Sequence, residues 1–324
     1  MPSQISQNRF LRLPPPEELV NLSEFEDVAK KILSSSMHET ISEASTGHFD
    51  HMTFRQRLMV NAMNLDLSTE LFGEKLFAPI IVAPIAHQKR FHVDGEAATL
   101  QGSARANATV ILSSQTSIPV SDLSTTTTSK PWFQIYAADK ESTSANITAA
   151  TSFGSPVLCV SFGGREDDKV SDITPQHWNQ AEAIRKEFEG PVVLKGILSQ
   201  QEAEIAVQRN YSGIILSSHN RESPVEPAHA INSLPAIAKS TNGAVPILID
   251  GNFRRGSDVL KALALGAKAV LLGRPVMWGL ASYGALGVQA VLELLYNELA
   301  RSMAASGRPT IPMIDSTLVK MHSQ

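Results

Sequence analysis

The chain has 324 residues, of which 43% are hydrophobic, 19% are charged and 6% are aromatic, and its formal net charge is -4. This composition is that of a soluble globular protein with a sizeable core, divided into one large domain or two ordinary ones. The balanced charge and the absence of a basic run argue against a nucleic acid or a membrane surface as partner, because both require clustered Lys and Arg. Chemistry on a small-molecule substrate is therefore expected.

The single cysteine, Cys159, can form neither an internal disulfide nor a cysteine-based zinc site. The histidines other than His87 and His219 show no metal-ligand spacing, so no metal site is expected. The N-terminal residues lack the apolar core of a signal peptide, no run of eighteen apolar residues occurs, and the C-terminal KMHSQ is not an SKL-type peroxisomal signal. A reducing compartment, the cytoplasm, is the expected location.

The first 75 residues differ from the rest and are interpreted as an N-terminal extension, with a Pro-rich start at 14–16 and a helix predicted from Glu18 to about Ser35. From Pro79 onward a short apolar run recurs, each time followed by a polar or Gly-containing stretch and a helix-compatible one. These runs are PIIVAP (79–84), TVILSS (109–114), WFQIY (132–136), PVLCVS (156–161), PVVLKG (191–196), GIILSS (213–218), PILIDG (246–251) and AVLLGR (269–274).

The runs are rich in Val, Ile and Leu and are continuously apolar, which is typical of parallel strands buried on both faces. Their spacing of about 20 to 35 residues leaves room for one crossover helix each, and 173–190 and 257–267 have the pattern of such helices. The sequence thus predicts an α/β fold, a (β/α)8 barrel over residues 76–324 behind the 1–75 extension. A doubly wound open sheet is the alternative, and Thr125–Ser129 is expected to be a loop.

In a barrel of this kind the functional residues lie at the carboxyl ends of the strands. The runs end there in polar residues or glycines, namely Ser113, Ser114, Gln134, Tyr136, Ser161, Lys195, Ser217, His219, Asp250, Gly251, Gly273 and Arg274. Serines and glutamines in such places often bond only to backbone. Lys195 within PVVLKGI is different, because a buried lysine requires a partner, here an anion or a cofactor.

A phosphate site is predicted from IDGNFRRGSD (249–258) followed by LLGRP (271–275). Barrels commonly bind phosphate after their last two strands, through backbone N–H groups and a helix N-terminus. Arg254 and Arg274 would add charge-assisted hydrogen bonds. A solvated arginine pair would explain the RRG stretch alone, but not its combination with LLGRP.

Together with APIAHQKRFHVDGE, LSSQTS, FQIY, LKGI and SSHN, these motifs resemble the FMN-dependent α-hydroxy acid oxidase and dehydrogenase family, which includes glycolate oxidase, lactate oxidase and flavocytochrome b2. The resemblance extends from about Glu24 to Gly307. It implies a (β/α)8 barrel that binds FMN and an oxidoreductase acting on CH–OH groups. Relatives in this family are often tetramers, so a homo-oligomer is expected.

The resemblance also implies a set of cofactor-binding positions. They comprise the backbone against the flavin at Ile85 and Ala86, the ring contacts Ser113, Gln134 and Lys195, the ribityl-side Ser217 and Asp250, and the phosphate-binding Gly251, Arg254, Gly273 and Arg274. Lys195 would lie beside N1 and O2 of the ring, where a positive charge favours the anionic reduced flavin.

On the substrate side, the resemblance implies that His219 removes the hydroxyl proton of a 2-hydroxy acid while hydride passes to flavin N5, with Tyr136 and Arg165 nearby. Three positions depart from the family pattern. Glu43 in SEASTG (42–47) stands where the family has a carboxylate-binding tyrosine, and Ser161 replaces the aspartate that steadies the protonated histidine. In SSHNRE, Glu222 replaces the substrate arginine, with Arg221 one position early.

The loop after Arg165 is shorter than in the family, which predicts a more open pocket that admits a bulkier substrate, or water and oxygen. Oxidation of a 2-hydroxy acid, with oxygen or another molecule as electron acceptor, is the first hypothesis. The second is an FMN enzyme of changed substrate class, acting on a large alcohol, amine or carbon skeleton. The third is a flavin-binding protein without turnover. His87 is the next candidate for the base after His219.

Overall fold

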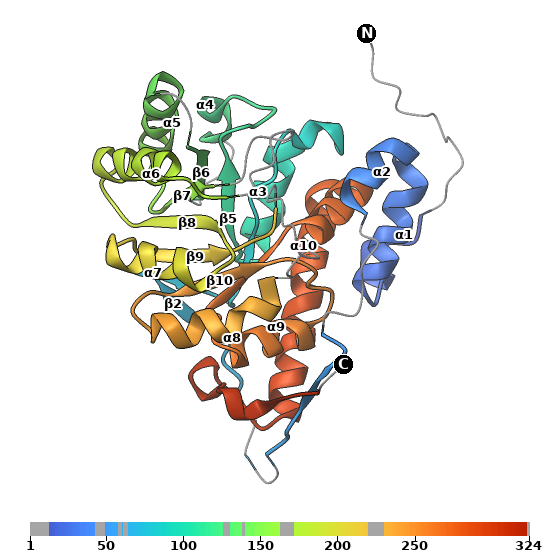
Figure 1. The fold of residues 1–324 in the computed structure, drawn as a ribbon. Coiled ribbons are helices and arrows are strands. Elements are labelled where there is room, and N and C mark those ends of the chain that lie inside the picture. Colours follow the sequence, from blue (N-terminus) through green and yellow to red (C-terminus); the bar gives the residue numbers. More distant parts are fainter. Residues whose placement is uncertain are drawn as a thin grey trace.

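The structure, a computed structural model, describes residues 13–42, 49–57, 60, 64–125, 130–137, 140–162, 172–219 and 230–322. Eight parallel strands form a closed barrel in the order in which they follow along the chain (Figure 1). They are β4 (Ile80–Val82), β5 (Thr109–Ser113), β6 (Trp132–Tyr136), β7 (Leu158–Ser161), β8 (Val192–Ile197), β9 (Gly213–Leu216), β10 (Ile247–Asp250) and β11 (Ala269–Leu272). Each lies within one of the predicted apolar runs, except that β8 extends one residue beyond the run 191–196. Because β11 pairs with β4, the ring is closed and the open sheet is excluded.

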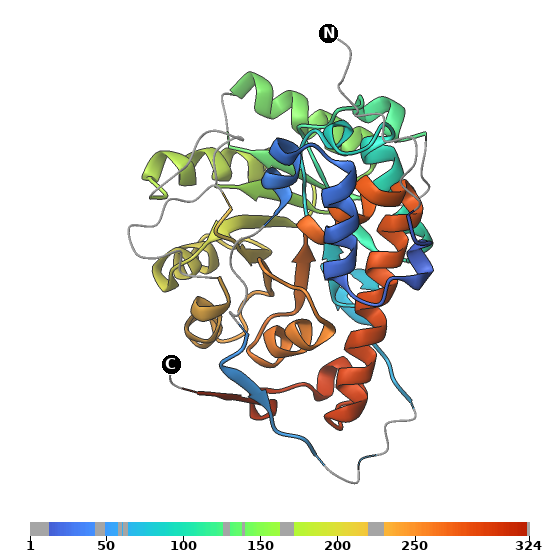
Figure 2. The same ribbon diagram turned by 90° about the vertical axis from the view of Figure 1, so that its right-hand side faces the viewer.

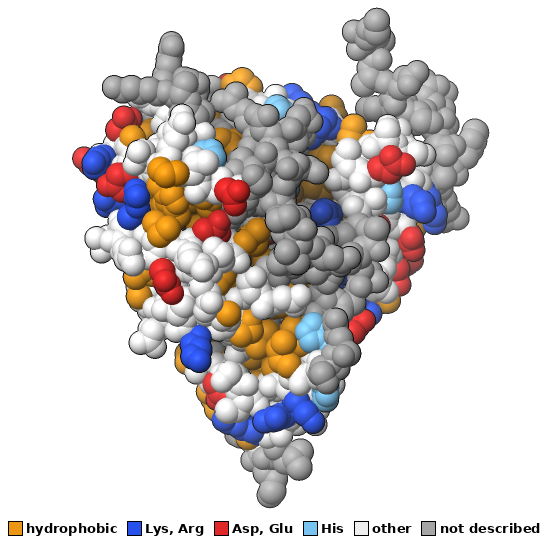
Figure 3. Space-filling view, viewed as in Figure 1, with side chains coloured by type: hydrophobic (Ala, Val, Ile, Leu, Met, Phe, Trp, Pro, Cys, Tyr) orange, Lys and Arg blue, Asp and Glu red, His pale blue; other side chains and the backbone are white. Residues whose placement is uncertain are grey.

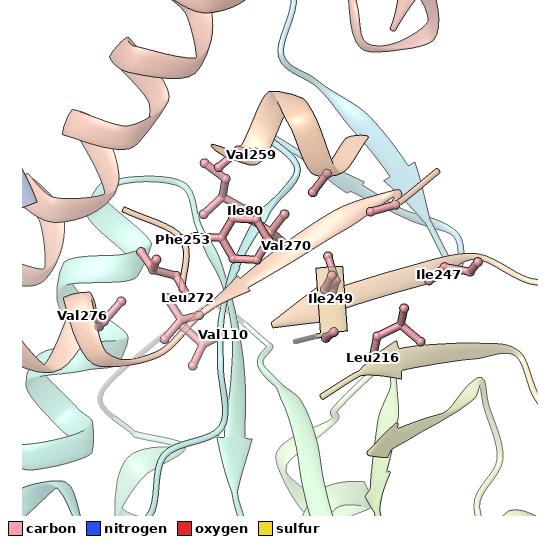
Figure 4. Close-up of a cluster of buried hydrophobic side chains, with 14 of the residues drawn as sticks. Ile80, Val110, Leu216, Ile247, Ile249, Phe253, Val259, Val270, Leu272 and Val276 are labelled. Atoms are coloured by element: carbon pink, nitrogen blue, oxygen red, sulfur yellow. The ribbon is translucent and has the colours of Figure 1, made fainter. Parts of the chain in front are cut away.

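Both faces of the barrel wall are buried, which explains the continuous apolar runs. One set of side chains fills the barrel interior, including Ile81, Ile111, Trp132, Cys159, Val193, Ile215, Leu248 and Leu271. The alternate residues face outward and pack beneath the helices, and Figure 4 shows part of this outer layer near β4, β10 and β11.

The helices that follow the strands are α3 (Gly95–Arg105), α4 (Val120–Leu123), α5 (Lys140–Phe153), α6 (Pro175–Glu187), α7 (Gln200–Gln208), α8 (Ala230–Thr241), α9 (Gly256–Ala264) and α10 (Arg274–Ala305). The predictions at 173–190 and 257–267 correspond to α6 and α9. The start of α6 is fixed by Thr174, whose side chain accepts the N–H of His177, and by Pro175 at the first helical position.

The last helix, α10, is long and apolar enough by composition to cross a membrane, but 67% of its most apolar window is buried inside the protein. Its backbone is non-helical at Tyr283 and Gly284, so it consists of two helices joined at a kink. A helix buried in this way is explained as part of the core.

On the face shown in Figure 3, acidic and basic side chains are interspersed along the left edge.

In the N-terminal extension, the predicted helix 18–35 corresponds to α1 (Leu22–Ile32), which follows a short 3-10 turn at Pro16–Glu18. A second helix, α2 (Ser35–Ile41), was not predicted, and it begins where the side chain of Ser34 accepts the N–H of Met37. Figure 2 shows α1 lying along α10. Further along, β1 (Met52–Phe54) pairs antiparallel with β12 (Val319–Met321) near the end of the chain.

A hairpin of β2 (Thr69–Leu71) and β3 (Glu74–Leu76) closes the amino-terminal end of the barrel. The Phe72 ring at its turn lies 5.4 Å from that of Trp132, at the start of β6. An added Cβ at Gly213, at the start of β9, would lie 2.7 Å from the same ring. The hairpin thus fills this end, and the carboxyl ends of the strands form the opposite end of the barrel, called the mouth below.

Candidate active site

Polar side chains at the ends of β5, β6 and β7 are hydrogen-bonded in a row. Ser113 Oγ donates to Gln134 Oε1 at 3.0 Å, and Gln134 Nε2 donates to Ser161 Oγ at 3.0 Å. All three side chains are buried. Because its amide is bonded at both ends, Gln134 has one orientation. The structure thus brings the predicted Ser113 and Gln134 together and places Ser161 beside them.

Next to this row, at the ends of β8, β9 and β10, lies a triangle of Lys195, Ser217 and Asp250, and Ser161 is opposite Lys195 in the register of β7 and β8. Lys195 Nζ donates to Ser217 Oγ at 2.8 Å and lies 3.0 Å from Asp250 Oδ2, and Ser217 Oγ donates to the same oxygen at 2.8 Å. The side chains of Lys195 and Asp250 are 6% and 16% exposed. Asp250 therefore supplies the charged partner that a buried lysine requires.

The backbone after Lys195 contributes to this placement. Gly196 has a φ of +104°, and the pairing of β8 with β9 shifts between Lys195 and Ile197. Such a bulge bends the strand and redirects the side chains beside it. A residue with a Cβ would be strained at this φ, which accounts for the glycine in PVVLKGI.

The loop after β4, which carries Ile85 and Ala86, is held by a buried carboxylate. Glu96 Oε1 accepts the N–H of Gln88 at 3.0 Å and that of Ser117 at 2.9 Å, which ties together the loops after β4 and β5. Gln88 Nε2 in turn donates to the carbonyl of Ile85 at 3.2 Å. Sequence reasoning missed Glu96. A glutamate on the buried side of the GEAATLQGSAR helix is the signal that could have indicated it.

Open space adjoins the two glycines of the predicted phosphate site. A Cβ at Gly251, where φ is +106°, would have no described atom within 4 Å, and one at Gly273 would meet only Ala83 Cβ at 3.8 Å. Arg274 begins α10, with Gly273 at its N-cap, so the positive end of this helix dipole points to the same place. The donors present fit a phosphate group.

The guanidinium of Arg254 lies over the ring of Trp278, 4.5 Å from its centroid. The backbone N–H groups of Arg254 and Arg255 are bonded to Asp258 at 3.0 and 2.9 Å, so this turn at the start of α9 is fixed by its own carboxylate. Burial raises the pKa of that carboxyl, and the two N–H groups oppose this effect. Trp278 is a second residue that sequence reasoning missed.

His219 and Tyr136 are at the same mouth. His219 is exposed. Its backbone N–H donates to Ser217 Oγ at 3.3 Å, and this bond holds the His219 backbone directly beside the lysine triangle. Tyr136 ends β6 and is partly buried, opposite Ser161 in the pairing register. The remaining candidates, Glu43, Arg165, Arg221 and Glu222, lie outside the described residues.

Comparisons with known proteins show which family the chain belongs to. The family model for FMN-dependent dehydrogenase matches residues 26–168 and 164–321. A peroxisomal (S)-2-hydroxyacid oxidase of Arabidopsis thaliana is 32% identical, over 95% of this chain and 98% of the relative. An L-lactate oxidase of Nostoc sp. is 30% identical, over 93% and 98%.

Solved structures of mandelate oxidase are similar as well. A mandelate oxidase variant with (S)-mandelic acid has a TM-score of 0.84 and 27% identity, over 94% of this chain and 100% of that one. The closed parallel barrel, the buried Lys195–Asp250 ion pair and the open space beside Gly251 and Gly273 are thus found in a chain that matches one family over nearly its whole length. The protein belongs to the FMN-dependent dehydrogenase family and is an oxidoreductase with FMN as cofactor.

Proposed function

We propose that the protein oxidises a 2-hydroxy acid to the corresponding 2-oxo acid and passes the electrons to oxygen. The observation that carries this proposal is the triangle of Lys195, Ser217 and Asp250 with the exposed His219 bonded beside it at the barrel mouth. Relatives that cover 95% and 93% of the chain are named 2-hydroxyacid oxidase and L-lactate oxidase.

Bound FMN supplies the acceptor for the hydride that leaves the α-carbon of the substrate. In the proposed reaction, the His219 imidazole takes the hydroxyl proton as the C–H bond breaks, so that the C–O bond becomes a carbonyl. Lys195 provides a fixed positive charge where negative charge develops. Tyr136 lies at the same mouth, where its hydroxyl can bond to the substrate.

The residues proposed to hold the cofactor lie at the mouth of the barrel. Ser113, Gln134 and Lys195 would offer hydrogen bonds to the ring, and Ser217 and Asp250 would lie on the ribityl side. Arg254 and Arg274, with the backbone at Gly251 and Gly273, would bind the phosphate. Ile85 and Ala86, held through Gln88, would lie against the ring.

For the carboxylate of the substrate, the proposal keeps Arg165 and Arg221 as the cationic candidates and Glu43 as a substrate-side residue. The hypothesis of a changed substrate class is not favoured, because relatives that match more than nine-tenths of the chain are named for hydroxy acids. Binding without turnover is not favoured either, since both Lys195 and His219 are present at the mouth.

The test is the visible absorption of the FMN-loaded protein during anaerobic addition of L-lactate, glycolate and (S)-mandelate. Bleaching by at least one of them, followed by recovery of the colour and release of hydrogen peroxide on admission of air, is expected. A protein that keeps its colour with every acid of the series would contradict the proposal.

The role of His219 is tested by His219→Ala. A general base contributes ~10²–10⁴-fold, so turnover is expected to fall by that factor while FMN stays bound. His322→Ala is the matched control, because this exposed histidine bonds to Thr53 near the end of the chain and should leave turnover unchanged. If His219→Ala keeps full activity, His219 is not the base, and His87 becomes the candidate.

A homo-oligomer and a cytoplasmic location are proposed from the sequence alone. Light scattering of the purified protein tests the first, where a monomeric mass would contradict it. Microscopy of the tagged protein in its own cells tests the second, and some relatives are named as peroxisomal.

A further inference from the structure

We infer that Trp278 is a positioning residue that holds Arg254 for the cofactor phosphate, and that through Trp278 the N-terminal extension strengthens FMN binding. This inference rests on the proposed role of Arg254 in phosphate binding. It adds a link between two parts of the chain that are more than two hundred residues apart.

The stack between the two side chains is the first observation. Trp278 is 0% exposed and lies in the first half of α10, and the Arg254 guanidinium is centred 4.5 Å from its ring centroid. Tryptophan is the most favourable aromatic partner for a cation, and the attraction grows as water is excluded. A long arginine side chain that is already held on a ring loses less freedom when it binds an anion.

Trp278 is itself held by the N-terminal extension. Its indole Nε1–H donates to the carbonyl of Ile41, the last residue of α2, at 3.0 Å. This bond uses one of the carbonyl groups that the end of a helix leaves without an intrahelical partner. The indole plane is therefore fixed by an element outside the barrel, and the guanidinium follows that plane.

The same extension has a second contact, at Phe49, with the segment that carries Arg254. The Phe49 ring lies 5.4 Å from the ring of Phe253, the residue directly before Arg254, and the Phe49 carbonyl accepts Lys261 Nζ of α9 at 2.9 Å. Figure 4 shows the Phe253 side chain among Ile80, Val259 and Val270. The residue before Arg254 and the ring beneath its guanidinium are thus both anchored from the extension.

A purely structural role for Trp278 makes a different prediction from a positioning role. If the tryptophan only fills the core, its loss weakens binding of the whole cofactor. If it positions Arg254, the loss falls on the phosphate alone. Riboflavin has the ring and ribityl chain of FMN but no phosphate, so the ratio of its dissociation constant to that of FMN measures the phosphate contribution.

The experiment titrates FMN and riboflavin into the FMN-free full-length protein, followed by quenching of flavin fluorescence. For Trp278→Leu the FMN affinity is expected to fall roughly 5- to 30-fold, with less than about a twofold change for riboflavin. Trp278→Phe keeps an aromatic face but loses the bond to Ile41, so a smaller fall confined to FMN is expected. Equal losses for both ligands in Trp278→Leu would overturn the positioning role.

Arg254→Met separates this inference from the proposed phosphate site. That variant should lower FMN affinity roughly 10- to 100-fold and leave riboflavin unchanged. If it does not, the phosphate assignment itself fails. In the Arg254→Met background, Trp278→Leu should bring no further change in the ratio, because the positioned group is gone. A full additional loss would overturn the inference while leaving the phosphate site intact.

Trp178→Leu is the matched control, because Trp178 is also buried and carries Arg209 at 5.4 Å from its ring. It should lower stability and leave the ratio unchanged. Should Trp278→Leu not yield folded protein, Trp278→Phe and Phe49→Leu test the same link, and an unchanged ratio in both would overturn it.

Discussion

A lysine whose side chain is 6% exposed is tolerated in the barrel wall because Asp250 lies 3.0 Å away and Ser217 is bonded to both. Removing water from two charges is costly, and it is offset only when their mutual attraction is joined by further hydrogen bonds. The triangle meets this condition with three short contacts. Its geometry therefore bears on the stability of the cofactor-free protein as well as on the proposed chemistry.

Lys195→Met is accordingly expected to lower the free energy of unfolding of the FMN-free protein by about 3 kcal/mol, because Asp250 would be left buried without its cationic partner. The double variant Lys195→Met with Asp250→Asn should recover most of this loss, since no charge is then left uncompensated. Urea unfolding followed by circular dichroism measures both. If the double variant is no more stable than the single one, the ion pair is not what stabilises Lys195.

Two tyrosines provide a second comparison at this scale. Burial raises the pKa of Tyr211 to about 12, and among the described residues no hydrogen-bond partner is within reach of its hydroxyl. The hydroxyl of Tyr283 instead donates to the carbonyl of Pro14 at 2.6 Å.

Tyr211→Phe should therefore leave stability unchanged or raise it by up to about 1 kcal/mol, because a desolvated hydroxyl is removed. Tyr283→Phe should lower stability by about 1 kcal/mol, because a bond between the N-terminal extension and α10 is lost. Thermal unfolding of the two variants and of the parent protein measures both effects. A loss of stability of equal size in both variants would contradict the conclusion that only the Tyr283 hydroxyl makes a stabilising hydrogen bond.

At the scale of elements, the start of α9 is pressed against the second half of α10. A Cβ at Gly256 would lie 2.1 Å from the backbone nitrogen of Leu299, and Glu298 accepts the N–H of Gly256 at 2.8 Å. The same carboxylate pairs with Arg255 at 2.8 Å. Close approach of the two helices thus requires a glycine and provides an acidic cap for α9.

Gly256→Ala is expected to lower the stability of the FMN-free protein by about 3 kcal/mol, because backbone atoms cannot yield as a flexible side chain does. Gly273→Ala, with a φ of -102° and a nearest neighbour at 3.8 Å, should cost less than about 1 kcal/mol in the same protein. Denaturant unfolding of both without FMN is the measurement. Similar losses of stability in the two variants would show that the close approach of α9 and α10 does not require a glycine at position 256.

The elements that could be predicted from the sequence are those defined by local patterns. All eight strands were recognisable because burial on both faces leaves an apolar run, and α6 and α9 have clear helical patterns. The hairpin of β2 and β3 and the pairing of β1 with β12 were missed, because their short strands are defined by distant partners. The helix α2, which begins beyond the predicted helix 18–35, was missed as well, because its start depends on one serine cap.

The candidate site divides in the same way. Lys195, Asp250 and the glycines are recognisable because their types are unusual at strand ends, and the partner of Lys195 was expected without being identified. Glu96 and Trp278 were missed, because each acts through a residue far away in the sequence or on another loop. Glu96 and Trp278 each lie in a helix whose sequence pattern does not set them apart from their neighbours.

At the scale of the whole molecule, the two ends of the barrel differ in role: residues at the amino ends of the strands stabilise the fold, and the candidate active site lies at the carboxyl ends. Phe72 at the hairpin turn contacts Trp132 and Gly213 at the amino ends of their strands, whereas the lysine triangle lies at the carboxyl ends. Cys159 lies in the barrel interior between the two, with 0% exposure. Burial raises the pKa of its thiol to about 12, so the native protein presents almost no thiolate at pH 8.

The reaction of Cys159 with a thiol reagent should therefore require opening of the barrel, and its rate should report global stability. Phe72→Ala removes the ring but keeps the Cβ and the φ of +54°, so only packing is lost. A loss of about 2 kcal/mol is expected, which would make Cys159 react roughly 30-fold faster at one pH, while turnover of a saturating 2-hydroxy acid stays within about twofold. A fall in turnover without faster labelling would show that the hairpin acts on the site, and would contradict the separation of the two ends.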